Sequence, residues 1–227
     1  MAPVKNALIV GASRGLGLGL VETFLALGWR VTATQRSASP GLAGLASEAL
    51  TVETVDIDDD AAVASLHGRL GGERFDVVFV VAGVATQADR PLHEVDRAVA
   101  AEVYRTNAVS PIRFAEAFAG SLAPGGLIVF MTSILGSVAL NTDGGWETYR
   151  ASKAALNTYA RSFELRHRGE GFGVVLMHPG WVRTEMGGAD ADLDVATSAA
   201  GMADAIEGRL GSEGCVYLDY AGQTLAW

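Results

Sequence analysis

Short apolar runs alternate along the chain with longer segments in which apolar residues recur at the spacing of a helix. Apolar runs bounded by glycine or polar residues are typical of strands buried on both faces of a parallel sheet, and the longer segments suit the helices that connect such strands. The alternation predicts strands over 7–10, 29–34, 50–55, 75–83, 126–133, 173–177 and 214–218. It predicts helices over 20–27, 61–70, 94–118, 149–168 and 195–209.

This order of strands and helices is that of a doubly wound parallel sheet, an α/β fold of the Rossmann type. The length of 227 residues suits one domain with a core on each side of its sheet. We therefore expect a single domain over residues 1–227. Residues 185–198 are polar and contain glycine, which favours a mobile loop beside the substrate.

The first predicted strand leads into a glycine-rich turn, Gly11-Ala-Ser-Arg-Gly15-Leu-Gly17-Leu-Gly19. Strand, turn and helix follow in the order that phosphate binding needs, because glycines let the backbone approach a pyrophosphate and the helix amides point toward it. The spacing G-x-x-x-G-x-G differs from the usual dinucleotide pattern G-x-G-x-x-G. A tight turn without a ligand would use the same glycines, so the interpretation rests on the position of the turn in the first βαβ unit.

Charged residues at the ends of the next two predicted strands indicate which nucleotide would bind. Arg36 follows the second strand, where an NAD site usually carries a carboxylate for the ribose 2′-hydroxyl. An arginine can instead form a bidentate pair with a 2′-phosphate, and Arg14 in the glycine turn could add to it. We therefore predict NADP(H) in preference to NAD(H); the alternative is that both arginines are solvated surface charges. Asp56, at the end of the third strand, either accepts from the adenine amino group or caps the next helix.

Tyr149 and Lys153 begin a predicted helix and, four residues apart, share one of its faces. A nearby ammonium favours the phenolate, and lowering the pKa of a tyrosine from about 10 to near neutrality takes about 4 kcal/mol. Ser133 ends a predicted strand, at the edge of the sheet where ligands bind. A surface tyrosine and lysine would have the same spacing, so the prediction depends on these neighbours. Asn107, in the middle of a predicted helix, is either a structural polar group or holds a water at a kink.

The ordered set Gly11-x-x-x-Gly15-x-Gly17, Ser133, Tyr149-x-x-x-Lys153 and Pro179-Gly180 resembles the classical short-chain dehydrogenase/reductase family over nearly the whole chain. Residues 217–222 and Trp227 are similar to its C-factor-like and sniffer-like carbonyl reductase branch. The resemblance implies an NADP(H)-dependent oxidoreductase that interconverts a carbonyl and an alcohol. The catalytic residues it implies are Asn107, Ser133, Tyr149 and Lys153. The cofactor-binding residues it implies are Gly11, Ser13, Arg14, Gly15, Leu16, Gly17, Arg36, Asp56, Ile57, Ala82, Gly83, Tyr149, Lys153, Pro179, Gly180, Val182 and Thr184.

The same resemblance implies a role for each catalytic residue. Tyr149 would be the general acid/base, and Lys153 would lower its pKa and hydrogen-bond the nicotinamide ribose. Ser133 would hold the substrate oxygen, and Asn107 would support a proton relay through water. The sequence departs from the family where Val80-Val81-Ala82-Gly83 replaces the usual Asn-Asn-Ala-Gly. The missing asparagine is thought to brace the sheet, so the departure concerns local geometry more than chemistry.

Apolar and aromatic residues in the loops at the same edge suggest a pocket for an apolar or aromatic carbonyl or alcohol, formed by Ile134, Leu140, Trp146 and Trp181. Packing or interface roles for the two tryptophans remain an alternative. A signalling or sensor protein of the C-factor type, which binds NADP with little turnover, is a second function to consider. An epimerase or dehydratase of the extended family is disfavoured, because such chains are usually longer and carry a separate substrate domain.

Composition and charge exclude several other classes. The net charge of −9 disfavours binding to nucleic acid or to an anionic membrane surface. A single cysteine, Cys215, excludes an internal disulfide and a multi-cysteine metal site, and we expect no metal. No apolar stretch approaches the roughly 20 residues that span a bilayer, and the amino terminus lacks signal-peptide features, so we expect a cytoplasmic protein. By family resemblance we expect a homodimer or homotetramer.

Overall fold

A seven-stranded parallel sheet forms the centre of the computed structural model, which describes residues 3–45 and 47–227. The strand order is β3-β2-β1-β4-β5-β6-β7. The first three strands are added toward one edge of the sheet and the last four toward the other, so the crossover point lies between β1 and β4. The strands are β1 (Asn6–Val10), β2 (Arg30–Gln35), β3 (Leu50–Thr54), β4 (Phe75–Val80), β5 (Leu122–Met131), β6 (Gly173–His178) and β7 (Gly214–Asp219). The predicted fold class, a doubly wound parallel sheet, is confirmed.

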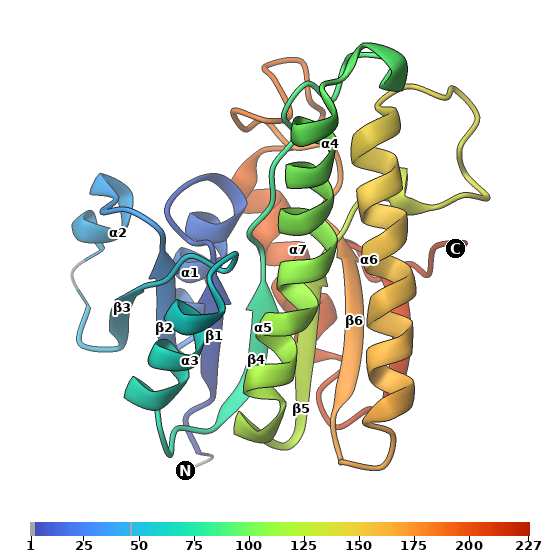
Figure 1. Cartoon of the computed structure of the whole chain (residues 1–227). Coiled ribbons are helices and arrows are strands. Elements are labelled where there is room, and N and C mark those ends of the chain that lie inside the picture. The colour runs from blue at the N-terminus through green and yellow to red at the C-terminus, as the bar shows by residue number, and fades with distance from the viewer. Residues whose placement is uncertain (1–2, 46) are drawn as a thin grey trace.

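Helices cover both faces of this sheet (Figure 1). They are α1 (Gly15–Ala26), α2 (Pro40–Gly44), α3 (Asp60–Arg69), α4 (Arg97–Tyr104), α5 (Ser110–Phe118), α6 (Glu147–Arg166) and α7 (Val195–Glu207). Figure 1 shows α4, α5 and α6 in front of the sheet and α1 and α7 behind it. The loops after β4, β5 and β6 gather at the end of the sheet where the parallel strands finish.

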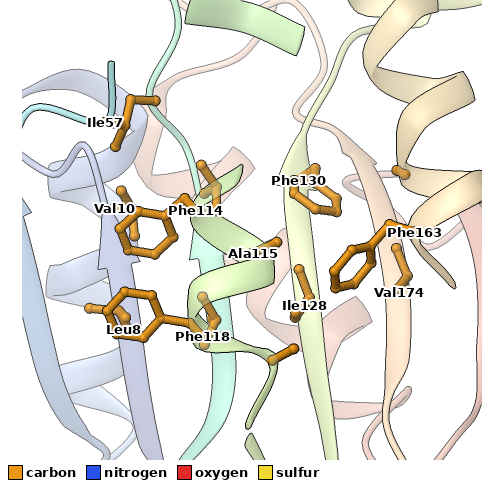
Figure 2. Close-up of a cluster of buried hydrophobic side chains, with 14 of the residues drawn as sticks. Leu8, Val10, Ile57, Phe114, Ala115, Phe118, Ile128, Phe130, Phe163 and Val174 are labelled. Carbon is orange, nitrogen blue, oxygen red and sulfur yellow. The ribbon is translucent and has the colours of Figure 1, made fainter. Parts of the chain in front are cut away.

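Each strand supplies side chains to both faces, because successive residues of a strand point in opposite directions. Leu8 and Val10 of β1 belong to a cluster with α3, α5 and α6. Ala7 and Ile9, the alternate residues, belong to a second cluster with α1 and α7. Figure 2 shows the first cluster, in which phenylalanines of α5 and α6 fill the space above β1 and β5. Burial on both faces explains why β1, β4 and β6 read as continuous apolar runs, whereas the edge strand β3 is largely exposed.

Two predicted helices differ from the structure. The first begins at Gly15 rather than at residue 20, so the later glycines of the turn lie inside α1. The predicted helix over 94–118 is interrupted by a π-helical turn, Arg105–Val109, which separates α4 from α5. Apolar spacing continues through such a turn, because it inserts a single extra residue into the helix. The interruption is centred on Asn107, which lies at the predicted kink.

Two predicted segments at the ligand edge also differ from the structure. β5 ends at Met131, so Ser133 lies two residues beyond the strand rather than at its last position. The loop predicted over 185–198 overlaps the helix predicted over 195–209, and the start of that helix is confirmed: α7 begins at Val195 after Asp194, whose side chain accepts a hydrogen bond from the Thr197 amide.

Asp58 joins the end of β3 to the π-helical turn. Its carboxylate accepts hydrogen bonds from the hydroxyls of Thr106 (2.7 Å) and Ser110 (2.6 Å) and pairs with Arg105 at 3.4 Å. The Asp58 side chain is only 17% exposed, so water replaces these bonds poorly. The next residue, Asp59, is the one whose side chain caps α3.

Replacing Asp58 with alanine should therefore lower the free energy of unfolding by about 2–3 kcal/mol, because two hydroxyls lose a charged acceptor in a sheltered site. Urea unfolding measures this change. Asp60→Ala is the matched control, since Asp60 lies two residues away and pairs with Arg113 on the open surface. Equal destabilisation by both substitutions would contradict the account.

Candidate active site

The residues proposed for the site meet at the carboxyl edge of the sheet, at and around the crossover between β1 and β4. The glycine turn follows β1, Arg36 follows β2, and Asp56 and Ile57 follow β3. Ala82 and Gly83 follow β4, Ser133 follows β5, and 179–184 follow β6, while Tyr149 and Lys153 lie in the first turns of α6. Ligands of open α/β sheets bind in this position.

The glycine turn is too close to its neighbours for larger residues. Gly11 has a φ of +88°, and a Cβ added to it would lie 2.8 Å from the Cα of Ala82. A Cβ on Gly17 would lie 2.2 Å from the carbonyl oxygen of Gly11. Among the described residues, no side chain caps the start of α1 and its first turn has no acidic residue. The first amides of α1 and the positive end of its dipole are therefore available for a pyrophosphate, which this turn fits.

The end of β2 lies beside this turn. The amide of Gly11 donates to Thr34 Oγ1 (3.1 Å) and that of Ala12 donates to the Thr34 carbonyl (2.7 Å). Arg36 follows two residues after Thr34 and is exposed, which suits a phosphate-binding side chain. Arg14, also exposed, pairs with Glu185 of the segment after β6 at 2.7 Å. The structure thus places Arg36 next to the turn, while Arg14 already has an acidic partner.

Asp56 and Ile57 are the predicted adenine-side residues. Asp56 Oδ1 accepts from the amide of Asp58 (3.0 Å), so this aspartate forms a local turn rather than the cap of α3. Ile57 is buried in the hydrophobic cluster above the sheet, so little of its side chain is exposed for contact with an adenine ring. Their roles in binding adenine remain predictions.

The segment after β6 packs against the glycine turn. Gly180 has a φ of +82°, and a Cβ there would lie 2.5 Å from the Cδ1 of Leu193. Ser198 Oγ donates to the carbonyl of Pro179 at 2.6 Å, which holds the segment against α7. A Cβ on Gly15 would meet the methyl group of Thr184 at 3.6 Å. The segment therefore lies against both the glycine turn and α7.

Tyr149 and Lys153 are both buried, with exposed fractions of 8% and 2%. Lys153 Nζ lies 5.6 Å from the centre of the Tyr149 ring and donates to the carbonyl of Met131 at 2.9 Å. Ser133 is 8% exposed and its Oγ accepts from the amide of Leu135 at 3.2 Å. The structure brings the predicted serine, tyrosine and lysine together.

Burial is the main cause of the pKa shifts of Tyr149 and Lys153. It raises the pKa of Tyr149 to about 12, and interaction with the Ser133 hydroxyl opposes the shift. It lowers the pKa of Lys153 to about 8. The direction for Tyr149 is opposite to our prediction, because loss of water around the phenolate outweighs the stabilising interactions. At neutral pH the phenol and the ammonium are therefore both protonated.

Asn107 braces the exit of β4. Its Oδ1 accepts from the amide of Val84 (2.8 Å), and its Nδ2 donates to the Val84 carbonyl (2.8 Å) and to Ser152 Oγ (3.0 Å). A Cβ on Gly83 would lie 3.2 Å from Asn107 Oδ1 and 3.4 Å from Lys153 Nζ. The structural interpretation of Asn107 is therefore correct, and its part in a proton relay remains a prediction.

Backbone hydrogen bonds join the end of β1 to the residues after β4, where valine replaces the asparagine usual in the family. The amides of Val81 and Ala82 both donate to the carbonyl of Val10, at 2.9 and 3.0 Å. Val80 is buried in the core above the sheet. The two valines therefore place apolar side chains where the family pattern has asparagine, whose polar side chain is thought to brace the sheet.

Trp146 is the predicted pocket residue that lies against Tyr149. Its ring stands nearly perpendicular to that of Tyr149, with centres 5.7 Å apart. Its φ is +59°, unusual for a bulky residue. Arg150 holds this conformation, because its amide donates to the Trp146 carbonyl (2.8 Å) and its Nε donates to that of Gly145 (2.6 Å).

The other predicted pocket residues lie at the same edge without forming a closed pocket. Trp181 is exposed and its Nε1 donates to the carbonyl of Gly187 at 2.9 Å. Leu140 is exposed and Ile134 is half-buried. A cavity of about 240 Å³ between the loop after β5 and α6 is lined instead by Leu135, Gly136, Ser137, Val138, Asn141, Gly144, Glu147, Arg150, Ala151 and Ala154.

Glu185 and Tyr217 escaped the sequence-based prediction. Glu185 neutralises Arg14, and Tyr217 Oη donates to the carbonyl of Ser133. A charged loop residue and an aromatic residue in an apolar strand carry no local signal for such contacts.

Among the described residues, no group of three or more His, Cys, Asp or Glu side chains could hold a metal ion. In the same residues, no helix is long and apolar enough to cross a membrane.

The parallel sheet, its crossover between β1 and β4 and the uncapped glycine turn define an α/β domain of the dinucleotide-binding class. A family model described as short chain dehydrogenase matches residues 5–193. The chain therefore belongs to the short-chain dehydrogenase family. The catalytic roles of Asn107, Ser133, Tyr149 and Lys153 remain predictions from the family resemblance.

Individual relatives and solved structures are also similar to the chain. C-signal of Myxococcus xanthus is 44% identical over 138 residues, which are 60% of this chain and 83% of that protein. A putative short-chain dehydrogenase/reductase of Burkholderia multivorans with bound NADP is 42% identical, with a TM-score of 0.96 over 99% of this chain and 100% of that one. A carbonyl reductase of Pseudomonas aeruginosa in complex with NADP is 41% identical, with a TM-score of 0.91 over the same shares.

The lowered pKa of Lys153 predicts a pH dependence of stability. Between about pH 8 and pH 10.5 the unfolded chain binds the lysine proton more tightly than the folded protein, so stability should rise with pH in this window. Lys153→Met removes this contribution, and the stability of the wild type relative to the variant should grow by up to about 3 kcal/mol across the window. Urea unfolding at several pH values measures it. Parallel pH profiles for the two proteins would show that Lys153 is not desolvated in the folded state.

Proposed function

We propose that this protein is an NADP(H)-dependent oxidoreductase that interconverts a carbonyl and an alcohol, with Tyr149 as the general acid/base. The observation that carries the proposal is the meeting of three buried side chains, Ser133, Tyr149 and Lys153, beside a glycine turn that fits a pyrophosphate. The NADP complexes of two similar proteins, one of them a carbonyl reductase, support the same conclusion.

The residues of this chain would hold NADP(H) along the carboxyl edge. The amides at the start of α1 would take the pyrophosphate, and Arg36 the 2′-phosphate. Lys153 and Tyr149 would meet the nicotinamide ribose, and residues 179–184 would meet the nicotinamide end. When bound, the cofactor supplies a hydride to the carbonyl carbon or accepts one from the alcohol.

The protein side of the reaction is proton transfer and polarisation. Because burial raises the pKa of Tyr149 to about 12, its phenol is protonated at neutral pH and can donate to a substrate oxygen in the reductive direction. The hydroxyl of Ser133 would stabilise the same oxygen as negative charge develops there. The Lys153 ammonium favours the phenolate that remains, since it lies 5.6 Å from the centre of the ring.

An apolar or aromatic substrate is the class that the surroundings favour. The Trp146 ring stands against Tyr149 and remains 37% exposed, so it can contact a substrate at the phenol. Trp181 and Leu140 add exposed apolar surface at the same edge. A homodimer or homotetramer in the cytoplasm remains our prediction from the family resemblance.

A second candidate function is signalling with NADP bound and little turnover. The similarity to the protein named C-signal favours it. Cofactor binding alone would not require a serine hydroxyl directed at a buried tyrosine, so the arrangement of Ser133 and Tyr149 favours the enzyme. Measured turnover, and its loss in a Tyr149 variant, separate the two.

Arg36→Asp should weaken NADPH binding by about 100-fold or more and leave NADH binding unchanged or stronger, because a carboxylate repels the 2′-phosphate and can accept from a 2′-hydroxyl. Fluorescence titration with each nucleotide measures both affinities. Arg30→Asp is the matched control, since Arg30 is an exposed arginine at the opposite end of the same strand. An Arg36 variant that still prefers NADPH would sink the assignment of this residue.

Tyr149→Phe should lower kcat by about 10² to 10⁴-fold, because the acid that protonates the substrate oxygen is lost. The affinity for NADPH should change little, as most cofactor contacts lie elsewhere. Tyr159→Phe, on an exposed part of the same helix, should leave kcat unchanged. Turnover is followed by NADPH absorbance with apolar aldehydes and ketones. Retention of full activity in the Tyr149 variant would contradict its role as the acid.

A further inference from the structure

Tyr217 connects the edge strand β7 to the segment that carries Ser133. Its side chain is 1% exposed, and its Oη donates to the carbonyl oxygen of Ser133 at 2.5 Å. The two residues are 84 positions apart in the chain, so the bond joins separate parts of the fold. The same carbonyl also accepts from the amide of Gly136 at 2.8 Å, which uses its second lone pair.

A second set of bonds holds this segment from the side of α6. Thr132 Oγ1 donates to Asn157 Oδ1 at 2.7 Å, and Asn157 Nδ2 donates to the carbonyl of Gly136 at 3.4 Å. Asn157 lies one helical turn after Lys153. The residues on both sides of Ser133 are therefore attached to the helix that carries the general acid. Tyr217 supplies the attachment of Ser133 itself.

The tail of the chain holds Tyr217 in place. The ring of Trp227 packs on that of Tyr217 with centres 5.7 Å apart, and the amide of Leu225 donates to the Tyr217 carbonyl at 2.8 Å. The carbonyl of Trp227 accepts from the amide of Ala139 at 3.1 Å, in the loop after Ser133. Residues 217–227 thus support both the serine and the loop that follows it.

We infer that Tyr217 is a positioning residue for the reaction, which fixes the Ser133 backbone so that the serine hydroxyl points at the substrate oxygen and at Tyr149. The inference rests on the proposed function of Ser133. Tyr217 takes no proton and contacts no substrate, because its hydroxyl is already directed at a backbone carbonyl in the protein interior. Burial raises its pKa to about 12, so the hydroxyl stays protonated and remains a donor at working pH.

A phenylalanine at this position would fill the same volume and keep the contact with Trp227. The Ser133 carbonyl would keep its bond to the Gly136 amide, so we expect Tyr217→Phe to fold. What is lost is the direct restraint on Ser133, and displacement of a catalytic group by a fraction of an ångström lowers the rate without removing the site.

Tyr217→Phe should therefore lower kcat by about tenfold and leave the affinity for NADPH within about twofold of wild type. A double-mutant cycle with Ser133→Ala separates positioning from general destabilisation. If Tyr217 acts through Ser133, the tenfold loss should shrink to less than about twofold in the Ser133→Ala background. An equal loss in both backgrounds, or no loss in either, would overturn the inference. Tyr159→Phe again controls for removal of a tyrosine hydroxyl.

Amide hydrogen exchange tests the inference without turnover. In Tyr217→Phe the amides of Leu135 and Gly136 should exchange about tenfold faster than in wild type, because both donate to Ser133. Exchange in β1 should stay the same. Unchanged exchange at Leu135 and Gly136 would contradict the inference. If the wild-type protein turned over no carbonyl compound, the proposed function would fail, and the exchange result would still decide whether Tyr217 positions Ser133.

Discussion

The close approach of the β1 and β4 exits is the constraint on which the site depends. The carbonyl of Val10 accepts from two successive amides after β4, and Gly11 lies so near Ala82 that no Cβ fits between them. This contact places the glycine turn on one side of the crossover and Gly83, with Asn107 and Lys153 behind it, on the other. A nucleotide held by the turn would therefore lie across the crossover toward the catalytic group, as in other open α/β sheets.

The proposed catalytic group, Tyr149 and Lys153, is locally destabilising for the fold. Lys153 and Tyr149 are both withdrawn from water, which disfavours the charged form of each, so the pKa of Tyr149 rises and that of Lys153 falls. Trp146 adds a left-handed backbone conformation next to them. Such local costs are typical of functional sites and are offset by the surrounding structure. Here the offset comes from Asn107, Asn157 and Arg150, which fix the neighbouring segments through hydrogen bonds.

Apolar periodicity was sufficient to predict the sheet, its parallel character and most of its elements. It failed where helical spacing continues through a π turn, as around Asn107, and where a glycine such as Gly17 lies inside a helix rather than before it. Short spacings with chemical meaning, such as Tyr149 to Lys153, could be read directly. Contacts between distant segments could not, because nothing near Asp58, Glu185 or Tyr217 specifies its partner. The pKa direction of Tyr149 was missed for a related reason, since burial is a property of the packed structure.

The most direct test of the central claim is a crystal structure of the protein with NADP⁺. We expect the pyrophosphate at the start of α1, the 2′-phosphate against Arg36, and the nicotinamide ribose within hydrogen-bonding distance of Lys153 and Tyr149. A nucleotide bound away from the carboxyl edge of the sheet, or one whose ribose does not reach Lys153 and Tyr149, would contradict the claim.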